Sequence, residues 1–511
     1  MTNSDRLRRL RPTWGVVFVT LVAIVYACTL YKGIGGRVNH GDSAKFQFIG
    51  TIAGISHPPG NPLYLTISMF FQRLPLGLAP GTKASLLSAI FGVIAVACVY
   101  DAIRKVRSPL AATVGASSLA FGPLFWTLST EAEVYSLNAA LLAASVSGLA
   151  RWTVTQSQRA LAVGVACFVL AFGNHLTMVA AIPALVVAAV IVQRKGALKW
   201  PLFALGAAMT VITLAFYLYI PWRHGKAPYS EFDAPLTRAS FWEYVSAKKF
   251  QEGFGVPTLA DAVRVRLPMQ LTFLQKQWLW PVLGLAAIGA LRLMSFARAL
   301  GAYVLLATLG FLGFAFVYDI PDPDGFYVPV IVLLSVLIGC GVPTRARLSG
   351  VALIVAFALL AAPAWLFLKE HQRQVGLDVV EEMGDGQGNI LLDLPDLVRR
   401  IPEGSKLALP CNHYGCIEVV NYYRFADETA KERRIEVVQL TQGLRYGLPG
   451  PAPKLLPPAA ALTDTFCSIR ASDAAAMRGA GAEVPLLERP GRMVNDLWFP
   501  GVPIWCSVPK R

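Results

Sequence analysis

Apolar runs of about 20 residues recur along the first two thirds of this chain, and they constrain its fold more than any other feature. Helices of about that length cross the hydrocarbon core of a bilayer. Composition agrees, because only 15% of the residues are charged, whereas soluble domains carry about 25%. The pattern predicts a polytopic α-helical membrane protein and excludes a large soluble α/β protein.

The net charge of +15 does not indicate binding to nucleic acid. Arg and Lys fall in short clusters between apolar runs, as in "RKVR" and "QRKGALK", which is the pattern of cytoplasmic loops. With these clusters inside, the loops that remain outside are "TEAEVYS", "GNH", "PWRHGKAPYSEFDAP" and "YDIPDPDG". We therefore expect no nucleic-acid partner, and we expect the amino end of the chain in the cytoplasm.

About eleven transmembrane helices follow from this topology. The predicted spans are residues 14–31, 83–103, 109–127, 134–150, 160–173, 176–192, 201–220, 279–294, 299–317, 326–342 and 349–367. Residues 61–77 are also apolar, but a crossing there would invert every later loop. We interpret this segment as interfacial or re-entrant on the outer face, where backbone buried in protein is tolerated.

From residue 369 onward, short apolar runs alternate with turn residues and charge. This pattern predicts a small extracytoplasmic α/β domain over residues 369–511, after a transmembrane domain over residues 1–368. Four of the eight cysteines lie in the outer domain: Cys411, Cys416, Cys467 and Cys506. An oxidising compartment would allow one or two disulfides among them, with the pairing left open.

Polar side chains collect in the predicted outer loops. The clusters are Asp42 with Lys45 and His57, Glu131 with Glu133 and Tyr135, Asn174 with His175, Arg223 with His224, and Asp319 to Asp324 with Tyr327. Short loops would bring these clusters together at one membrane face. Ionisable residues at membrane depth cost about 2.5–3.5 kcal/mol each on insertion scales, so they tend to mark a site. For Asp322 and Asp324, an ordinary loop role is an equally good interpretation.

Five stretches resemble one known family: "GDSAKF", "SHPPGNPLY", "LLSAIFGVIAVA", "STEAEVYSLN" and "GNHLT". They are similar to the membrane glycosyltransferases related to protein O-mannosyltransferases, of the GT-C superfamily. The resemblance covers residues 14–225, with weaker similarity through "YLYIPWR" and the outer domain. GDS and HPPG at this spacing are more specific together than either is alone. The resemblance implies a polyprenyl-phosphate-linked sugar donor and a site on the external membrane face.

The resemblance also implies roles for individual residues. Asp42 matches the acid of the first outer loop, which serves as the catalytic base. His57 matches the start of the next helix, near the donor phosphate. Many relatives in the wider superfamily carry an acid pair where Asp42 is followed by Ser43. The sequence therefore leaves open whether a divalent metal takes part, and it indicates no other cofactor.

Elementary chemistry supports the same roles. An acceptor hydroxyl is a poor nucleophile, and a positioned carboxylate such as Asp42 can remove its proton. The departing polyprenyl phosphate carries negative charge that cationic side chains stabilise in a water-poor site. The candidates for this role are Lys45, His57, Arg223 and His224. Direct attack at the anomeric carbon would invert its configuration.

The remaining polar residues are candidates for binding the acceptor or the sugar: Glu133, Tyr135, Asn174 and His175. Glu131 and Glu133 would diverge on a helix, so we expect only one of them to face the site, and we favour Glu133. Glu131 at the positive end of the following helix would serve equally well as its cap.

We expect an inverting glycosyltransferase that acts on an acceptor hydroxyl, with protein Ser or Thr favoured and a glycan or lipid left open. The alternative is a transporter or flippase of a polyprenyl-linked lipid or substrate, which would place polar residues near the bilayer midplane. A lipid-binding protein without catalysis would need no positioned base. A bacterial inner membrane is the expected location, with the outer domain in the periplasm. Sugar identity, polyprenyl length and oligomeric state stay open.

Overall fold

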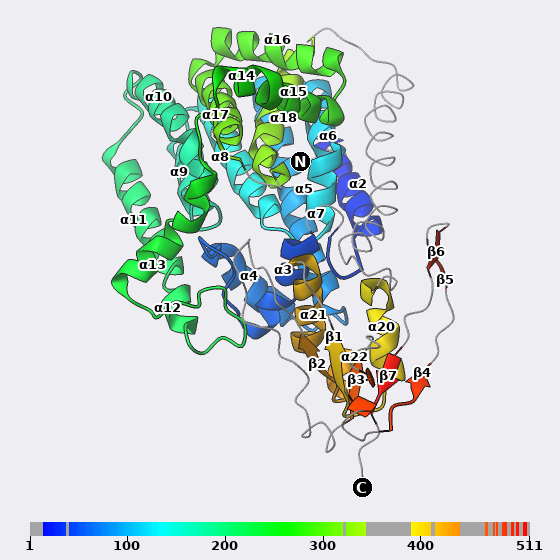
Figure 1. Ribbon diagram of the computed structural model, residues 1–511. Helices are drawn as coiled ribbons and strands as arrows, with labels where there is room; N and C mark the ends of the chain where they lie inside the picture. Colours follow the sequence, from blue (N-terminus) through cyan, green and yellow to red (C-terminus); the bar gives the residue numbers. More distant parts are fainter. Residues whose placement is uncertain are drawn as a thin grey trace, which may run out of the picture. The chain divides into compact units, whose positions relative to one another are not determined.

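The computed structural model describes residues 14–36, 40–319, 323–343, 390–409, 414–439 and parts of 465–507 (Figure 1). These residues form two compact units. Unit 1 contains described residues from 14–31, 53–71 and 85–343, and unit 2 contains those from 32–52, 72–84 and 390–507. The functional division predicted between residues 368 and 369 stays a prediction, because compact units need not coincide with functional domains.

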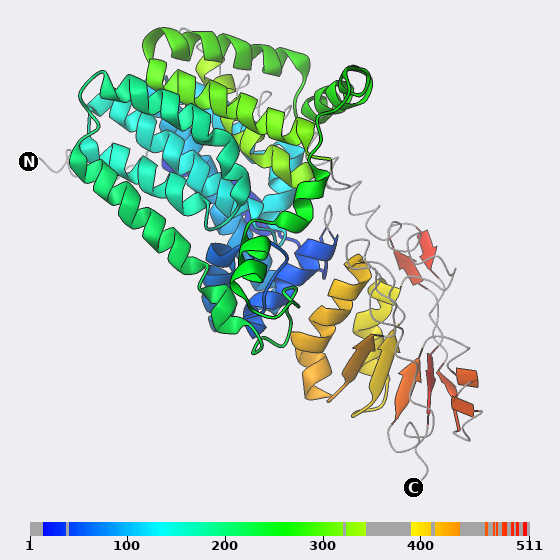
Figure 2. The same cartoon turned by 60° about the vertical axis from the view of Figure 1, so that its left-hand side comes forward.

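Unit 1 is helical. Its first half contains α2 (Trp14–Cys28), α4 (Pro62–Gln72), α5 (Pro80–Val106), α6 (Pro109–Ala120), α7 (Pro123–Thr130), α8 (Tyr135–Thr155), α9 (Gln158–Ala171), η1 (Leu176–Ala181) and α10 (Ile182–Gln193). The next elements are α11 (Trp200–Phe216), α12 (Tyr219–Arg223), α13 (Arg238–Val245), η2 (Lys248–Gly253), α14 (Leu259–Asp261) and η3 (Ala262–Arg266). The last are α15 (Leu267–Gln277), α16 (Trp280–Phe296), α17 (Arg298–Val317), η4 (Asp324–Tyr327) and α18 (Val328–Gly341). Figures 1 and 2 show α9 between α8 and α11.

Helical segments occupy every predicted span up to residue 342. Among the described residues, five helical segments are long and apolar enough to cross a membrane, or up to seven if two bent pairs each count as one span. Helices α2 and α9 are apolar but shorter. The predicted span 349–367 lies outside the described residues, so the total of about eleven stays a prediction.

Two details refine the predicted spans. Residues 109–127 are not one straight helix, because α6 and α7 meet at an angle of 66°. Pro123 begins α7 and has no N–H to continue the helix that precedes it. The uncertain segment 61–77 contains α4, whose 11 residues span about 16 Å. This is about half of the hydrocarbon core, so α4 is too short to cross alone, and its interfacial position stays a prediction.

Helix α18 forms the centre of unit 1, and all of its residues are buried. It packs against α6, α8, α16 and α17. Glycines allow close approach, because a Cβ added at Gly289 of α16 would overlap the Leu337 carbonyl oxygen of α18. A Cβ at Gly339 would likewise lie 2.8 Å from the Ala111 carbonyl oxygen of α6. Small residues at helix contacts are typical of packing inside membranes.

Unit 2 has a mixed sheet. Its strand order is β2 (Glu436–Gln439), β1 (Lys406–Leu409), β3 (Phe466–Ser468), β7 (Ile504–Cys506) and β4 (Leu486–Leu487). Strand β1 runs parallel to β2 and β3, whereas β7 is antiparallel to β3 and β4. The other elements are α20 (Ile390–Arg400), α21 (Tyr414–Phe425), α22 (Glu428–Glu432) and the hairpin of β5 (Arg492–Val494) with β6 (Leu497–Phe499).

A disulfide joins Cys467 of β3 to Cys506 of β7, which are direct partners across the antiparallel pair. This confirms that the predicted outer cysteines supply at least one disulfide. Cys411 and the side chain of Cys416 lie outside the described residues.

Helix α3 (His40–Ile52) belongs to unit 2, which its sequence position did not indicate. It packs along α21, with the rings of Phe48 and Phe425 5.8 Å apart. The Gly81 amide at the start of α5 donates a hydrogen bond of 3.5 Å to the Tyr422 hydroxyl of the same helix α21. Two segments from the first hundred residues are therefore part of the unit that contains the sheet.

Candidate functional site

The turn between α3 and α4, residues 53–61, contains His57 and is held in unit 1 by other parts of the chain. Ile55 pairs with residues 229–231, since its N–H donates to the Tyr229 carbonyl and its carbonyl accepts from the Glu231 N–H, both at 3.0 Å. Three side chains donate to further carbonyls of this turn: Tyr219 to Gly54 at 2.9 Å, Arg223 Nε to Ala53 at 2.8 Å, and Tyr244 to Ser56. The partners come from α12, α13 and the intervening loop. These hydrogen bonds therefore fix the backbone conformation of the turn.

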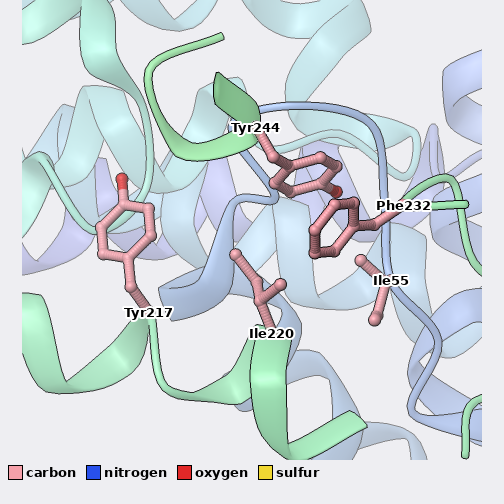
Figure 3. Packing of buried hydrophobic residues seen from close by; sticks show 5 residues of the cluster. All are labelled: Ile55, Tyr217, Ile220, Phe232 and Tyr244. Atoms are coloured by element: carbon pink, nitrogen blue, oxygen red, sulfur yellow. The ribbon is translucent and has the colours of Figure 1, made fainter. Parts of the chain in front are cut away.

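An apolar cluster supports these hydrogen bonds. Figure 3 shows its buried members, which are Ile55, Tyr217, Ile220, Phe232 and Tyr244. The rings of Phe232 and Tyr244 are 4.7 Å apart. Gly60 lies against the cluster with a φ of +94°, and an added Cβ would lie 3.1 Å from Ile220 and 3.2 Å from Tyr244. The glycine of the HPPG sequence is thus required both by its left-handed backbone and by close packing.

His57 lies in the turn itself and not at the start of a helix, so that part of the expectation was wrong. Helix α4 begins only at Pro62, because the HPPG segment forms a turn in which the Gly60 N–H donates to the His57 carbonyl at 2.7 Å. The His57 Nδ1 atom is 3.4 Å from the Ser56 hydroxyl, and its ring meets Phe250 of η2 edge-on at 6.0 Å. The imidazole is therefore half-buried and oriented by its neighbours.

Arg223 and His224 lie at the end of α12, beside this turn. The bond from Arg223 Nε to the Ala53 carbonyl places its guanidinium next to the segment that contains His57, and the guanidinium also lies over the Trp222 ring at 5.3 Å. The His224 ring is 5.0 Å from Phe232. Its buried Nδ1 has no hydrogen-bond partner among the residues that the structure describes. Arg223 thus contacts the segment that contains His57, and His224 contacts Phe232 of the adjoining cluster.

Glu131 and Glu133 lie between α7 and α8, and both are fully buried. Glu131 has an extended backbone, with φ −125° and ψ 171°, so the reasoning from helix geometry was wrong for this segment. The N-cap of α8 is Val134, which makes no side-chain capping bond, so Glu131 is not the N-cap residue of this helix. The Ser88 hydroxyl of α5 bonds both the N–H and the carbonyl of Glu133 at 3.0 Å, which fixes the linker.

Tyr64 and Asn174 extend this buried polar group. Burial raises the pKa of the Tyr64 hydroxyl, the nearby Glu133 carboxylate adds to the shift, and the Ser88 hydroxyl opposes it. Asn174 Nδ2 donates to the Val134 carbonyl at 3.0 Å. The Leu63 N–H of α4 donates to the Gly173 carbonyl at 2.9 Å. The segments around residues 64, 88, 133 and 174 therefore meet inside unit 1.

Tyr135 and His175 belong to an aromatic contact with Phe326. The centroid distances are 5.4 Å for Tyr135 with His175, 6.2 Å for Tyr135 with Phe326, and 5.6 Å for His175 with Phe326. His175 Nδ1 lies 3.4 Å from the Thr177 N–H and 2.9 Å from the Thr177 hydroxyl, which orients the ring. An added Cβ at Gly325 would overlap the Tyr135 ring. The segments after α7, after α9 and before α18 are thus in contact.

Asp42 and Lys45 belong to unit 2, unlike the residues above. Asp42 lies in the first turn of α3 and not in a loop, and the positive end of a helix dipole favours an acid there. Lys45 Nζ is 2.6 Å from Asp42 Oδ1, one helical turn away. The Lys45 side chain is fully buried, whereas that of Asp42 is 19% exposed. A buried ammonium thus orients a carboxylate that is partly accessible.

Asp319 is 69% exposed and pairs with Arg266 at 2.5 Å, so it is accounted for by a surface ion pair, and Asp322 lies outside the described residues. Within the described ranges, no three His, Cys, Asp or Glu side chains gather as metal ligands would.

Sequence reasoning missed Asn61, which is 1% exposed and has a positive φ of 42°. The Gly-Asn-Pro sequence signals a turn, but it does not reveal that the side chain is buried.

Known proteins resemble this chain in two ways. The family model of the Protein O-mannosyl-transferase TMEM260 N-terminal domain matches residues 42–198. Protein O-mannosyl-transferase TMEM260 of Mus musculus is 33% identical over 119 residues, which are 23% of this chain and 16% of that protein. The Dictyostelium discoideum protein of the same name is 29% identical over 118 residues, 22% of this chain and 14% of that one. The resemblance seen in the motifs is confirmed, over a small part of these relatives' length.

The fold resembles that of ArnT from Cupriavidus metallidurans. The crystal structure of ArnT bound to undecaprenyl phosphate has a TM-score of 0.60 at 13% identity, and the alignment covers 97% of this chain and 98% of that one. The apo structure gives 0.55 at 14% identity, over 97% of each chain. The predicted polytopic α-helical membrane fold is confirmed, and it resembles that of ArnT.

Proposed function

We propose that this chain is a glycosyltransferase that moves a sugar from a polyprenyl-phosphate donor to an acceptor hydroxyl. The observation that carries the proposal is the Asp42 carboxylate, held at 2.6 Å by the buried Lys45 ammonium. Asp42 is also the first residue of the segment that matches the O-mannosyltransferase family model. A carboxylate that is oriented but still partly accessible is suited to accept a proton from a hydroxyl.

The reaction is a single displacement. The acceptor oxygen attacks the anomeric carbon while Asp42 takes its proton. The bond between that carbon and the phosphate oxygen breaks, and the polyprenyl phosphate leaves with the electron pair. Attack from the side opposite the phosphate inverts the anomeric configuration. We assign stabilisation of the phosphate charge to His57, Arg223, His224 and Lys45.

The names of the related proteins support a choice of substrates. ArnT was crystallised with undecaprenyl phosphate, which supports a polyprenyl-phosphate donor. The mouse and Dictyostelium relatives are named protein O-mannosyl-transferases, which supports mannose as the sugar and a protein Ser or Thr hydroxyl as the acceptor. We place the reaction on the external face of a bacterial inner membrane, with the amino end of the chain in the cytoplasm and the C-terminal region in the periplasm.

The test is transfer by the purified full chain in vesicles, with a panel of polyprenyl-phosphate sugars and mass analysis of acceptor proteins. Asp42→Asn should lower turnover about 10²–10⁴-fold, the contribution of a positioned acid–base group. The matched control is Asp101→Asn, which also removes a paired carboxylate, since Asp101 binds Arg151 at 2.7 Å. We expect it to transfer at the wild-type rate.

The flippase alternative is tested in the same vesicles. It predicts transbilayer movement of the polyprenyl lipid without sugar transfer, at equal rates for the wild type and Asp42→Asn. That outcome, or full transfer by purified Asp42→Asn protein, would contradict the proposed function.

A further inference from the structure

Asn61 is a buried amide that the catalytic roles above do not use. Its side chain is 1% exposed. Neither Oδ1 nor Nδ2 has a hydrogen-bond partner among the residues that the structure describes. Buried amides are rarely left in this state, because removal from water is costly unless other hydrogen bonds replace the lost ones. Both atoms of Asn61 are therefore available to a bound molecule.

The backbone alone does not explain this amide. Asn61 has a positive φ of 42°, and asparagine adopts this conformation more readily than most residues. Ala53, however, has a φ of 49° at the other end of the same turn and carries no polar group. A positive φ in this turn thus does not require a side-chain amide, and it does not account for the burial of one.

Asn174 offers a second amide in the same part of unit 1. It is 1% exposed, and its Oδ1 has no hydrogen-bond partner within the described part of the chain. The bond from the Leu63 N–H to the Gly173 carbonyl joins the start of α4, which follows Asn61, to the residue before Asn174. The bond from Asn174 Nδ2 to the Val134 carbonyl brings the buried Glu133 linker to the same place.

We propose that Asn61 and Asn174 bind hydroxyl groups of the donor sugar, and that Asn61 determines which hexose is accepted. This inference rests on the proposed function. A sugar hydroxyl both donates and accepts hydrogen bonds, and an amide presents both kinds of partner. A buried amide distinguishes epimers strongly, because an epimer whose hydroxyl points elsewhere leaves the amide unsatisfied. In this proposal His57, Arg223 and His224 bind the phosphate. The Asn61 and Asn174 amides bind the hexose attached to it.

The experiment compares transfer from polyprenyl-phosphate mannose, glucose and galactose. Asn61→Gly removes the amide and keeps the left-handed backbone, which glycine adopts freely. We expect its KM for the preferred donor to rise about tenfold and its preference among the three donors to fall by about the same factor, with turnover less affected. Gln156→Gly is the matched control, because it places a glycine at a positive-φ position outside this turn, at the end of α8. It should keep the wild-type KM and preference.

A second variant tests the Asn61 amide without shortening the side chain. Asn61→Asp keeps the size of the side chain and replaces the NH₂ donor with an acceptor, so the order of preference among the donors should change. Wild-type KM and preference in either purified variant would overturn the role of Asn61 and leave the proposed function intact. Absence of transfer from every donor by the wild type would overturn the proposed function and this inference with it.

Discussion

Different interactions hold the His57 turn and the Asp42–Lys45 pair in place. Long-range partners hold the His57 turn through its backbone carbonyls, since Tyr244 reaches Ser56 across 188 residues of sequence. The Asp42–Lys45 pair is local, with its two charges one turn apart on α3. The first arrangement therefore depends on the folding of the part of unit 1 that supplies these partners, residues 219–244. The second depends on one helix and on keeping water away from Lys45.

Among the variants of these two regions, Lys45→Met should lower the turnover of sugar transfer most. This change removes the cation that orients Asp42 while it keeps a long apolar side chain in a buried position. We expect turnover to fall about 10–100-fold, because the base loses its fixed orientation. Steady-state transfer assays measure this effect. Lys45→Arg keeps the charge and should be less affected, and equal turnover of the wild type and Lys45→Met would show that the pair does not orient the base.

His57→Ala should act on donor binding more than on the chemical step. Loss of a hydrogen-bonding cation at the phosphate is worth about 1.5–3 kcal/mol, so we expect the donor KM to rise about tenfold or more. The KM for the acceptor should not change. His175→Ala, at a histidine that the structure places with Tyr135 and Phe326, should not reproduce this pattern. A lower turnover at an unchanged donor KM would remove His57 from phosphate binding.

These two regions also separate what sequence can predict from what it cannot. An acid and a lysine three residues apart would meet on any helix, and apolar runs indicated the helices and their polar loops. The sequence could not show that Tyr219, Arg223 and Tyr244 would donate to one distant turn, because such bonds depend on the packing of helices far apart in the chain. Likewise, a period of 3.6 residues predicted divergence of Glu131 and Glu133, but the linker that contains them is not helical.

Tyr244→Phe should weaken the His57 turn by a moderate amount. The change removes one hydroxyl and leaves the buried Ser56 carbonyl without that bond, which costs about 1–3 kcal/mol of unfolding free energy. We expect a lower thermal unfolding temperature in detergent and a higher donor KM, because the turn carries His57. Tyr100→Phe in α5 is the control. Unchanged unfolding and KM for Tyr244→Phe would show that the apolar cluster alone fixes the turn.

The smallest effect on transfer should follow from Cys467→Ser combined with Cys506→Ser. The disulfide closes a loop of 39 residues, and in the chain-entropy model its loss costs about 4 kcal/mol. This cost should appear as earlier thermal unfolding and faster proteolysis of the sheet in unit 2. Transfer at low temperature should stay within about twofold of the wild type, since the disulfide joins β3 to β7, whereas α3 packs on α21. A loss of transfer as large as that expected for Lys45→Met would show that transfer depends on this disulfide.

The central position of α18 has a consequence for synthesis of the protein. In the described part of the chain, every helix that packs against α18 precedes it in sequence, from α6 to α17. Helix α18 is therefore synthesised after its neighbours. The glycine-containing surfaces of α6 and α16 are made before the helix that packs on them. Nascent chains that end before residue 328 contain the HPPG turn and all of its hydrogen-bond partners but lack the helix at the centre of unit 1. In the described part of unit 1, α18 is thus an apolar helix that is synthesised after the helices it packs against.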